Sequence, residues 1–203
     1  MTLLEKAPAE SFREGEIPVL ETERLTLRAP RKDDIEMVAI LANDLRIAQN
    51  TTGLPHPYTL ADAQTWFDRV NKGEGETTFL ATLHDGSILG VCGLARRDRP
   101  PHGGYWLGYW FGVRHWGKGY ATEAARAVID HAFDDLGHQV LYSGARVSNP
   151  ASRRVLEKCG FQWTGVGLYR IRSLASSAPS DCFRLDRGIW ASLKSWGASK
   201  RVQ

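Results

Sequence analysis

Two glycines that flank a lysine, Gly117-Lys118-Gly119, form the part of this sequence best suited to ligand chemistry. They lie between an aromatic run that predicts a strand, Tyr105–Val113, and a helix whose apolar residues recur at steps of three and four. Those helix residues are Ala121, Ala124, Ala125, Val128, Ile129, Ala132, Phe133 and Leu136. Small residues at a helix start let successive backbone N–H groups converge on one point, where the helix dipole adds partial positive charge. The turn therefore predicts an anion site, and phosphate is the favoured anion.

Two nucleotide-binding motifs fit this turn poorly. Gly112-x-x-x-x-Gly117-Lys118 matches most of a P-loop, but a P-loop continues with a Ser or Thr that binds Mg²⁺, and this chain has Gly119 there. The dinucleotide fingerprint G-x-G-x-x-G requires a glycine where this chain has Thr122. The remaining option is a turn for the pyrophosphate of coenzyme A.

Residues 116–121, W-G-K-G-Y-A, resemble the coenzyme A signature of the GNAT (Gcn5-related) N-acetyltransferase superfamily. Trp116 stands where that signature usually has Gln or Arg. The longer run W-G-K-G-Y-A-T-E-A is similar to the branch that contains the ribosomal-protein N-terminal acetyltransferases, in which Trp is common at that position. The resemblance implies a set of cofactor-binding residues: Phe111, Gly112, Val113, Arg114, Trp116, Gly117, Lys118, Gly119, Tyr120, Ala121, Thr122, Asn149 and Ser152.

A second segment, residues 149–161, resembles the N-x-x-S…EK-x-G-F segment of the same family. In that family the Asn contacts the pantetheine or its water shell, and the Ser or a nearby Tyr lies close to the thioester sulfur. The resemblance therefore implies these roles for Asn149 and Ser152. Taken alone, Asn149 is an ordinary helix N-cap and Ser152 an ordinary residue of a first helical turn, so the structural interpretation stays open beside the functional one.

The implied reaction is transfer of an acetyl group from acetyl-CoA to a primary amine through a tetrahedral intermediate. Backbone N–H groups around Phe111–Val113 are expected to stabilise the oxyanion, and Ser152 and Tyr109 are the candidate catalytic side chains. The aromatic strand has no carboxylate to act as the base. Trp106 and Tyr109 lie near that position, His102 falls in a Pro/Gly loop, and Glu123 is expected to serve the helix dipole, so water is a candidate base.

The missing carboxylate favours a peptide N-terminus as acceptor, because an α-amine with a pKa of about 7.7–8.0 is already partly neutral at physiological pH. Two alternatives remain: acetylation of a small amine such as a polyamine, an amino-acid-like metabolite or an antibiotic, and a non-catalytic coenzyme A sensor. Aromatic residues of Tyr105–Trp116 either line an acceptor pocket or pack in the core.

Composition restricts the other function classes. The 203 residues are 42% hydrophobic, and 26 basic against 23 acidic residues give a net charge of only +3, which argues against direct nucleic-acid binding. No apolar run suggests a membrane span or a signal peptide, so a cytoplasmic protein is expected, and its oligomeric state stays open with a homodimer as one candidate. Cys92, Cys159 and Cys182 are expected to be buried thiols, and the dispersed histidines predict no metal site.

The pattern along the chain predicts an α/β (α+β) fold of the GNAT type, with a mixed sheet of about seven strands and about four helices. The expected strands are residues 21–28, 78–83, 88–95, 105–113, 140–147, 161–171 and 180–189, and the expected helices cover residues 33–43, 59–70, 120–136 and 150–159. Specific signals are a capping box from Asp33 to Glu36, a helix cap at Thr59 with Asp62, and a hairpin turn at Asp85-Gly86. Residues 1–20 are expected to form an arm, 21–190 a single acetyltransferase domain, and 191–203 a tail.

Overall fold

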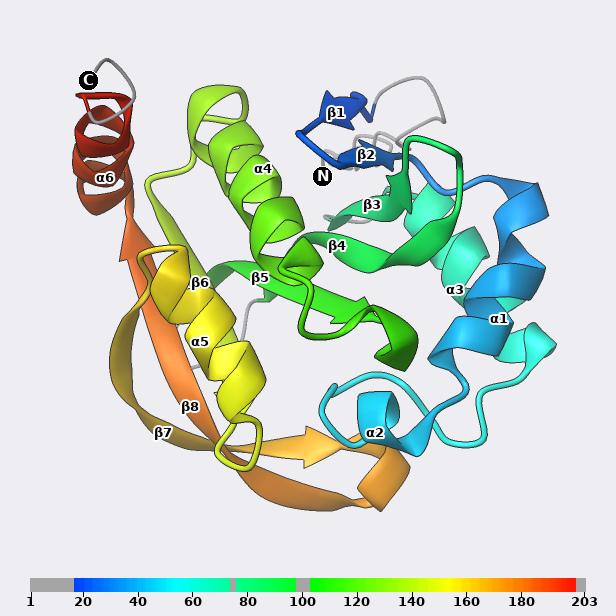
Figure 1. The fold of residues 1–203 in the computed structure, drawn as a ribbon. Helices are drawn as coiled ribbons and strands as arrows, with labels where there is room; N and C mark the ends of the chain where they lie inside the picture. The colour runs from blue at the N-terminus through cyan, green and yellow to red at the C-terminus, as the bar shows by residue number, and fades with distance from the viewer. Residues whose placement is uncertain (1–16, 74–75, 98–102, 200–203) are drawn as a thin grey trace, which may run out of the picture.

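The computed structural model of the protein describes residues 17–73, 76–97 and 103–199. Within these residues, eight strands form one sheet and six α-helices surround it (Figure 1). The strands are β1 Leu20–Glu21, β2 Leu25–Arg28, β3 Glu76–Leu83, β4 Ile88–Arg97, β5 Gly104–Phe111, β6 Val140–Arg146, β7 Gln162–Ile171 and β8 Ser176–Asp186. The helices are α1 Ile35–Ala42, α2 Leu45–Ala48, α3 Leu60–Asn71, α4 Tyr120–Asp134, α5 Pro150–Lys158 and α6 Arg187–Ser199. The expected mixed α/β fold is confirmed.

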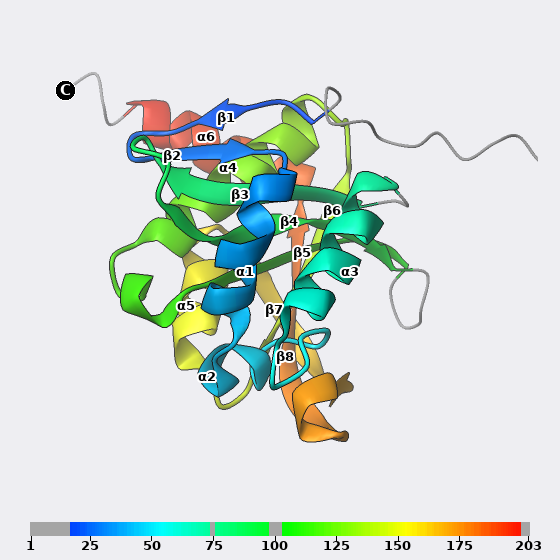
Figure 2. The same cartoon turned by 90° about the vertical axis from the view of Figure 1, so that its right-hand side faces the viewer.

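The strands follow the order β1-β2-β3-β4-β5-β6-β8-β7, and all neighbours are antiparallel except β5 and β6. The crossover helix α4 joins that parallel pair. Helices α4 and α5 cover one face of the sheet and α1 and α3 cover the other (Figure 2). A three-layer arrangement follows, because each face of the sheet buries its apolar side chains under helices.

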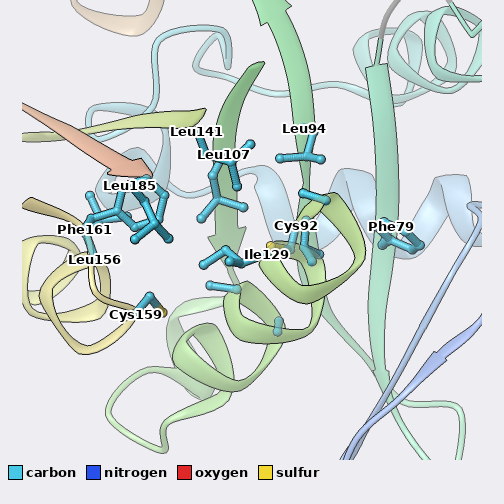
Figure 3. Close-up of a cluster of buried hydrophobic side chains, with 14 of the residues drawn as sticks. Phe79, Cys92, Leu94, Leu107, Ile129, Leu141, Leu156, Cys159, Phe161 and Leu185 are labelled. Atoms are coloured by element: carbon cyan, nitrogen blue, oxygen red, sulfur yellow. The ribbon is translucent and has the colours of Figure 1, made fainter. Parts of the chain in front are cut away.

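Alternation along β5 assigns its side chains to the two faces. Leu107, Tyr109 and Phe111 belong to the core under α4, part of which Figure 3 shows with Leu107 and Ile129 among the packed side chains. Trp110 packs instead against the second core, which lies under α1 and α3. Because neighbouring residues of a strand point to opposite faces, Trp106 and Gly108 share the face of Trp110.

The parallel pair β5 and β6 separates soon after it begins. Only Tyr105 with Leu141 and Trp106 with Tyr142 are paired. At the next position Ser143 Oγ donates to the carbonyl of Leu107 at 2.9 Å, so a side chain replaces the ladder hydrogen bond. Beyond this point no described strand pairs with the second half of β5 on its β6 side, and the sheet opens there.

Several local predictions are confirmed. Thr59 caps α3, with its Oγ1 accepting from the N–H of Asp62 at 3.2 Å and the Asp62 carboxylate accepting in return from the N–H of Thr59 at 3.0 Å. The β3–β4 hairpin turns at Asp85-Gly86, where Gly86 has a φ of +86° and its N–H donates to Leu83. The glycine is required there because an L side chain rarely adopts that φ.

The N-terminal elements differ from the prediction in two places. Residues 21–28 do not form one strand, because the chain turns at Thr22–Arg24 and Leu20–Glu21 pairs back onto β2. Glu123, a hundred residues away, holds this turn by accepting from Thr22 and Arg24, a contact that alternation cannot reveal. The expected capping box lies two residues earlier than predicted, since Arg31 rather than Asp33 is the N-cap and Asp34 rather than Glu36 accepts the N-cap N–H.

The remaining differences concern element ends. The aromatic strand ends at Phe111, and Val113–His115 forms a 3-10 turn. The last strand begins at Ser176, before the predicted start at residue 180, because Ser176 pairs with Ile171 of β7. The chain then enters α6 at Arg187, where a strand to residue 189 and a tail from residue 191 were expected. Trp190 fixes this helix, since its Nε1 donates to Asp130 of α4 at 2.7 Å.

Cysteine burial follows the prediction only in part. Cys92 and Cys159 are buried free thiols, whereas Cys182 is half-buried and lies 3.3 Å from the hydroxyl of Tyr169. Burial raises the pKa of Cys159 to about 11, so its thiol is protonated at neutral pH.

Within the part of the chain that the structure describes, no helix is both long and apolar enough to span a membrane.

Candidate functional site

The glycine turn adopts a conformation that leaves its N–H groups available. Gly117 and Gly119 have φ angles of +75° and +85°, so both occupy the left-handed region that favours glycine. Helix α4 starts immediately afterwards, and the N–H groups of Thr122 and Glu123 already donate to the carbonyl of Gly119. In the described chain no protein acceptor meets the N–H groups of residues 117–121. The turn and the α4 dipole thus present free donors to an anion.

Trp116 connects this turn to the end of β5. Its indole Nε1 donates to the carbonyl of Phe111 at 2.7 Å, while its ring remains 45% exposed. The hydrogen bond satisfies an acceptor at the open edge of the sheet. Trp116 thereby gains a structural role at the position where the related signature usually has Gln or Arg.

Arg24 supports the turn from behind, and sequence analysis did not identify it. Its Nη1 donates to the carbonyl of Lys118 at 2.9 Å, its Nη2 forms an ion pair with Glu123 at 2.6 Å, and its guanidinium lies 4.7 Å above the Tyr120 ring. Burial alone would raise the pKa of Glu123, but hydrogen bonds from Thr22 and Arg24 outweigh it and lower that pKa. Glu123 lies in the first turn of α4, where it was expected to interact with the helix dipole, and it also holds Arg24 against the glycine turn. The spacing of residues in the sequence does not predict this ion pair.

The two candidate catalytic side chains meet across the sheet opening. Tyr109 comes from β5 and Ser152 from the first turn of α5, and their hydroxyl oxygens lie 2.9 Å apart. The Tyr109 hydroxyl also lies within donating distance, 3.2 Å, of the Ser152 carbonyl. Asn149 caps α5, because its Oδ1 accepts from the N–H of Ser152 at 3.2 Å. This contact shows the structural role of Asn149, and it also fixes the position of Ser152.

The protonation state of Tyr109 follows from its surroundings. Burial raises its pKa well above the usual value for tyrosine, and the hydrogen bond with Ser152 offsets only part of that effect. Tyr109 is thus a proton donor and not a base at neutral pH. The Tyr109–Ser152 pair can donate a hydrogen bond to an atom that gains negative charge nearby.

The open edge of β5 also exposes backbone donors. Gly112 donates its N–H to Leu89 of β4, and the groups of an antiparallel strand alternate in direction, so Gly108 and Trp110 also face β4. The N–H groups of Tyr109 and Phe111 therefore face the opening beside β6. Oxyanion stabilisation was expected from backbone N–H groups around Phe111–Val113. The N–H of Phe111 belongs to that segment, whereas the N–H of Tyr109 lies two residues before it.

A single cavity of about 970 Å³ joins these features. It passes from the glycine turn along the open edge of β5 to the face of the sheet under α1 and α3. The predicted site residues that line it are Tyr109, Phe111, Trp116, Gly117, Gly119, Tyr120, Ala121, Thr122, Asn149 and Ser152. Gly112, Val113, Arg114 and Lys118 lie next to it in sequence without lining it. Arg114 donates instead to the neighbouring His115 at 2.9 Å, and Lys118 offers its carbonyl to Arg24.

Asp62 and Glu76, the two carboxylates in the described lining of the cavity, are each paired with an arginine, so no free carboxylate base lies at its far end. Trp106 lines it, with 6% of its surface exposed, but its indole cannot accept a proton at neutral pH. Glu123 faces Arg24 outside this cavity, and His102 lies outside the described residues. His115 lines the cavity near the turn, and burial, followed by the charges of Arg114 and Lys118, lowers its pKa. Among the described residues, no group of three or more His, Cys, Asp or Glu side chains could hold a metal ion.

Residues 24–162 match the family described as acetyltransferase (GNAT) domain. Among curated proteins, the uncharacterized protein YkkB of Bacillus subtilis (strain 168) is 32% identical over 147 residues, which cover 71% of this chain and 86% of YkkB.

Two solved structures show the same fold at low sequence identity. One is a spermidine N-acetyltransferase from Vibrio cholerae in complex with CoA and spermine, with a TM-score of 0.70, 20% identity, and coverage of 84% of this chain and 99% of that chain. The other is Mycobacterium smegmatis RimJ in complex with CoA-disulfide, with a TM-score of 0.71, 18% identity, and coverage of 86% and 90%.

Proposed function

Because the chain belongs to the acetyltransferase (GNAT) domain family, we propose that it transfers the acetyl group of acetyl-CoA to the N-terminal α-amine of a peptide or protein. The observation that carries this proposal is the continuity of the cavity. A donor-rich turn, a hydroxyl pair and an open space under α1 and α3 lie along one path. A coenzyme A sensor would need only the turn.

In the proposed complex, the pyrophosphate of acetyl-CoA accepts from the N–H groups of residues 117–121. The pantetheine arm continues the sheet along the open edge of β5, which places the thioester beside Tyr109 and Ser152. The cavity volume lies at the upper end of the usual range for ligand pockets, about 300–1,000 Å³, as expected for a site that holds a cofactor and an acceptor.

The reaction proceeds by direct attack of the neutral amine on the thioester carbonyl carbon. The nitrogen lone pair forms the C–N bond, and the carbonyl oxygen becomes an oxyanion that accepts from the free N–H groups of β5. When the intermediate collapses, the C–S bond breaks and sulfur leaves as a thiolate. The hydroxyls of Tyr109 and Ser152 donate to that thiolate, and the proton lost by the amine passes to water.

The α-amine assignment rests on the lack of a free carboxylate base in the described lining of the cavity, where the carboxylates Asp62 and Glu76 are each paired with an arginine. An N-terminal amine has a pKa of about 7.7–8.0 and is partly neutral at physiological pH, whereas a lysine-like amine near 10.4 needs a stronger base. Acetyl-CoA and peptide N-termini are both available in the cytoplasm, where we place the protein.

The test is a panel of amine acceptors incubated with acetyl-CoA and the full chain, read by release of free thiol. The panel contains peptides with free N-termini, the same peptides with blocked N-termini and one lysine, and small amines. We expect thiol release with free N-termini and little with the blocked peptides. Binding of acetyl-CoA without thiol release for any acceptor would contradict the proposal and favour a sensor.

A further inference from the structure

The residues that line the cavity include more positively than negatively charged side chains. Six arginines line the cavity: Arg46, Arg69, Arg97, Arg146, Arg154 and Arg172. Among the described residues that line it, the only carboxylates are Asp62 and Glu76. Both are already engaged, since Asp62 lies 4.0 Å from Arg172 and Glu76 lies 3.3 Å from Arg69. The cavity lining is therefore cationic after its own ion pairs are counted.

Arg97 is one arginine that these carboxylates do not neutralise. Its guanidinium lies 5.0 Å from the centre of the Trp106 ring, and no described carboxylate lies within ion-pair distance of it. Burial lowers the pKa of Arg97, which shows that it is poorly hydrated, although an arginine remains charged at neutral pH. The charge of Glu76 acts on Arg97 only from beyond ion-pair distance, so among the described residues this half-buried, stacked guanidinium has no carboxylate in contact and is suited to a ligand anion.

Two neighbouring N–H groups also lack acceptors. Trp106 is more than nine-tenths buried, and its indole Nε1 has no hydrogen-bond partner. Arg146 donates from Nη1 to the carbonyl of Gln49 at 2.8 Å, but its buried Nε has no partner. Buried donors without acceptors are uncommon in folded proteins, so each of these positions points to an absent acceptor.

The three donors lie on one face of the sheet. Ala95 of β4 pairs with Trp106, and Trp106 pairs with Tyr142 of β6. Because every second residue of a strand shares a face, Arg97 lies on the side of Trp106, and so does Arg146. A Cβ at Gly144, between Tyr142 and Arg146, would lie 3.8 Å from the Trp106 ring.

We infer that the acceptor carries a carboxylate close to its reactive amine, and that Arg97, Arg146 and the indole N–H of Trp106 form the subsite for it. This inference rests on the proposed function and names the substrate class for the same cavity. Arginine binds a carboxylate through two parallel hydrogen bonds, and the indole N–H supplies a further donor. A polyamine, which is cationic along its length, meets like charges in this cavity and is a poor acceptor. The carboxylate belongs either to an acidic residue near a peptide N-terminus or to a small amino acid.

The experiment compares acceptors that differ in one charge. Three peptides of equal length share the first residue and have Asp, Asn or Lys in second place, and aspartate, asparagine and spermidine represent the small amines. The full chain is assayed by thiol release from acetyl-CoA. We expect kcat/KM for the Asp peptide or for aspartate to exceed that of the Asn analogue by about 10-fold, with the Lys peptide and spermidine below both. The better of the two acidic acceptors identifies the source of the carboxylate.

Substitution of the subsite arginines tests whether these residues cause the preference. Arg97→Gln and Arg146→Gln should each bring the Asp-to-Asn ratio of kcat/KM towards one, and Arg97→Lys should retain part of it. The matched control is Arg184→Gln, because Arg184 is an exposed arginine of β8 that pairs with Asp186 and does not line the cavity. The control should keep the full ratio. A ratio unchanged in both subsite variants would overturn the assignment of the subsite.

The outcomes separate this inference from the proposed function. Equal kcat/KM for the Asp, Asn and Lys peptides together with equal kcat/KM for aspartate and asparagine, or a preference for the Lys peptide or spermidine, would overturn the inference while leaving acetyl transfer intact. If no acceptor releases thiol, the proposed function fails. Calorimetric titration of the Asp and Asn peptides, and of aspartate and asparagine, into the CoA complex then decides the inference, which requires tighter binding of the acidic member of at least one pair and is overturned by equal or undetectable binding in both.

Discussion

The two ends of the cavity present different kinds of binding groups, backbone N–H groups at one end and side chains at the other. The turn end uses backbone N–H groups from one continuous stretch, Gly117–Ala121, and needs glycine at two positions with positive φ. The other end uses side chains from strands β3 to β8 and from helices α2 and α3, which meet only in the folded chain. Under the proposed function, the backbone site binds the ligand part common to all coenzyme A reactions, and the side-chain site sets the choice of acceptor. The hydroxyl pair of Tyr109 and Ser152 lies between the two ends.

The largest effect is expected for a substitution at the turn end of the cavity, and it concerns the affinity for CoA. Gly119→Val should weaken CoA binding by about 100-fold or more, because valine at a φ of +85° is strained by roughly 1–2 kcal/mol and its Cβ would lie 3.3 Å from Arg24 Nη2. Calorimetry measures the affinity.

Gly86→Val is the matched control for this substitution. Gly86 has nearly the same φ, +86°, but lies in the β3–β4 hairpin, where nothing lies within 4 Å of a new Cβ. Both variants should lose similar stability by circular dichroism, and only Gly119→Val should lose CoA. A folded Gly119→Val protein with the affinity of the parent would show that this turn does not bind the cofactor.

A smaller effect is expected between the two ends. Tyr109→Phe and Ser152→Ala should each lower kcat by about 10- to 100-fold, because a hydrogen bond to a charged group contributes about 1.5–3 kcal/mol and the thiolate forms only during reaction. Steady-state kinetics checks kcat, and calorimetry should find the affinity for acetyl-CoA nearly unchanged. An unchanged kcat in both variants would leave the pair as a structural contact between β5 and α5.

Arg24→Gln tests the support behind the turn. Loss of the hydrogen bond to the Lys118 carbonyl and of the ion pair with Glu123 should weaken CoA binding by about 5- to 10-fold, since the turn must then be ordered by the ligand. Titration calorimetry compares this variant with Arg184→Gln, which removes an exposed arginine elsewhere. An affinity equal to that of the control would mean that the turn holds its conformation without Arg24.

The smallest effect is expected for Lys118→Ala. Lys118 is exposed and does not line the cavity, so its charge reaches the pyrophosphate only through solvent. CoA affinity should fall by about two- to three-fold at low salt, and the difference should disappear as salt is added. A large loss that persists at high salt would indicate a direct contact between Lys118 and the phosphates.

Sequence reasoning succeeded where the signal is local. The turn and α4 were predicted from glycines and three-four spacing within one stretch, and the match of residues 24–162 confirms the family that the two motif segments indicated. Ser152 and Tyr109 were both named as candidate catalytic residues, but their contact was not predicted, because 43 residues separate them in the chain.

Long-range contacts explain what sequence reasoning missed. Arg24 lies 99 residues from Glu123, and no periodicity connects them. The acceptor end depends on Arg97, Trp106 and Arg146, whose common face is defined only by the order of β4, β5 and β6. Helix α6 was also missed, since the apolar pair Ile189-Trp190 is too short to distinguish a strand from a helix and the contact of Trp190 with α4 decides it.

The most direct test of the central claim is a crystal structure of the full chain with CoA and an acetylated peptide product. The account predicts the pyrophosphate on the N–H groups of residues 117–121, the sulfur within hydrogen-bond distance of the Tyr109 or Ser152 hydroxyl, and the peptide under α1 and α3. A pyrophosphate bound elsewhere, or a sulfur directed away from that hydroxyl pair, would contradict it.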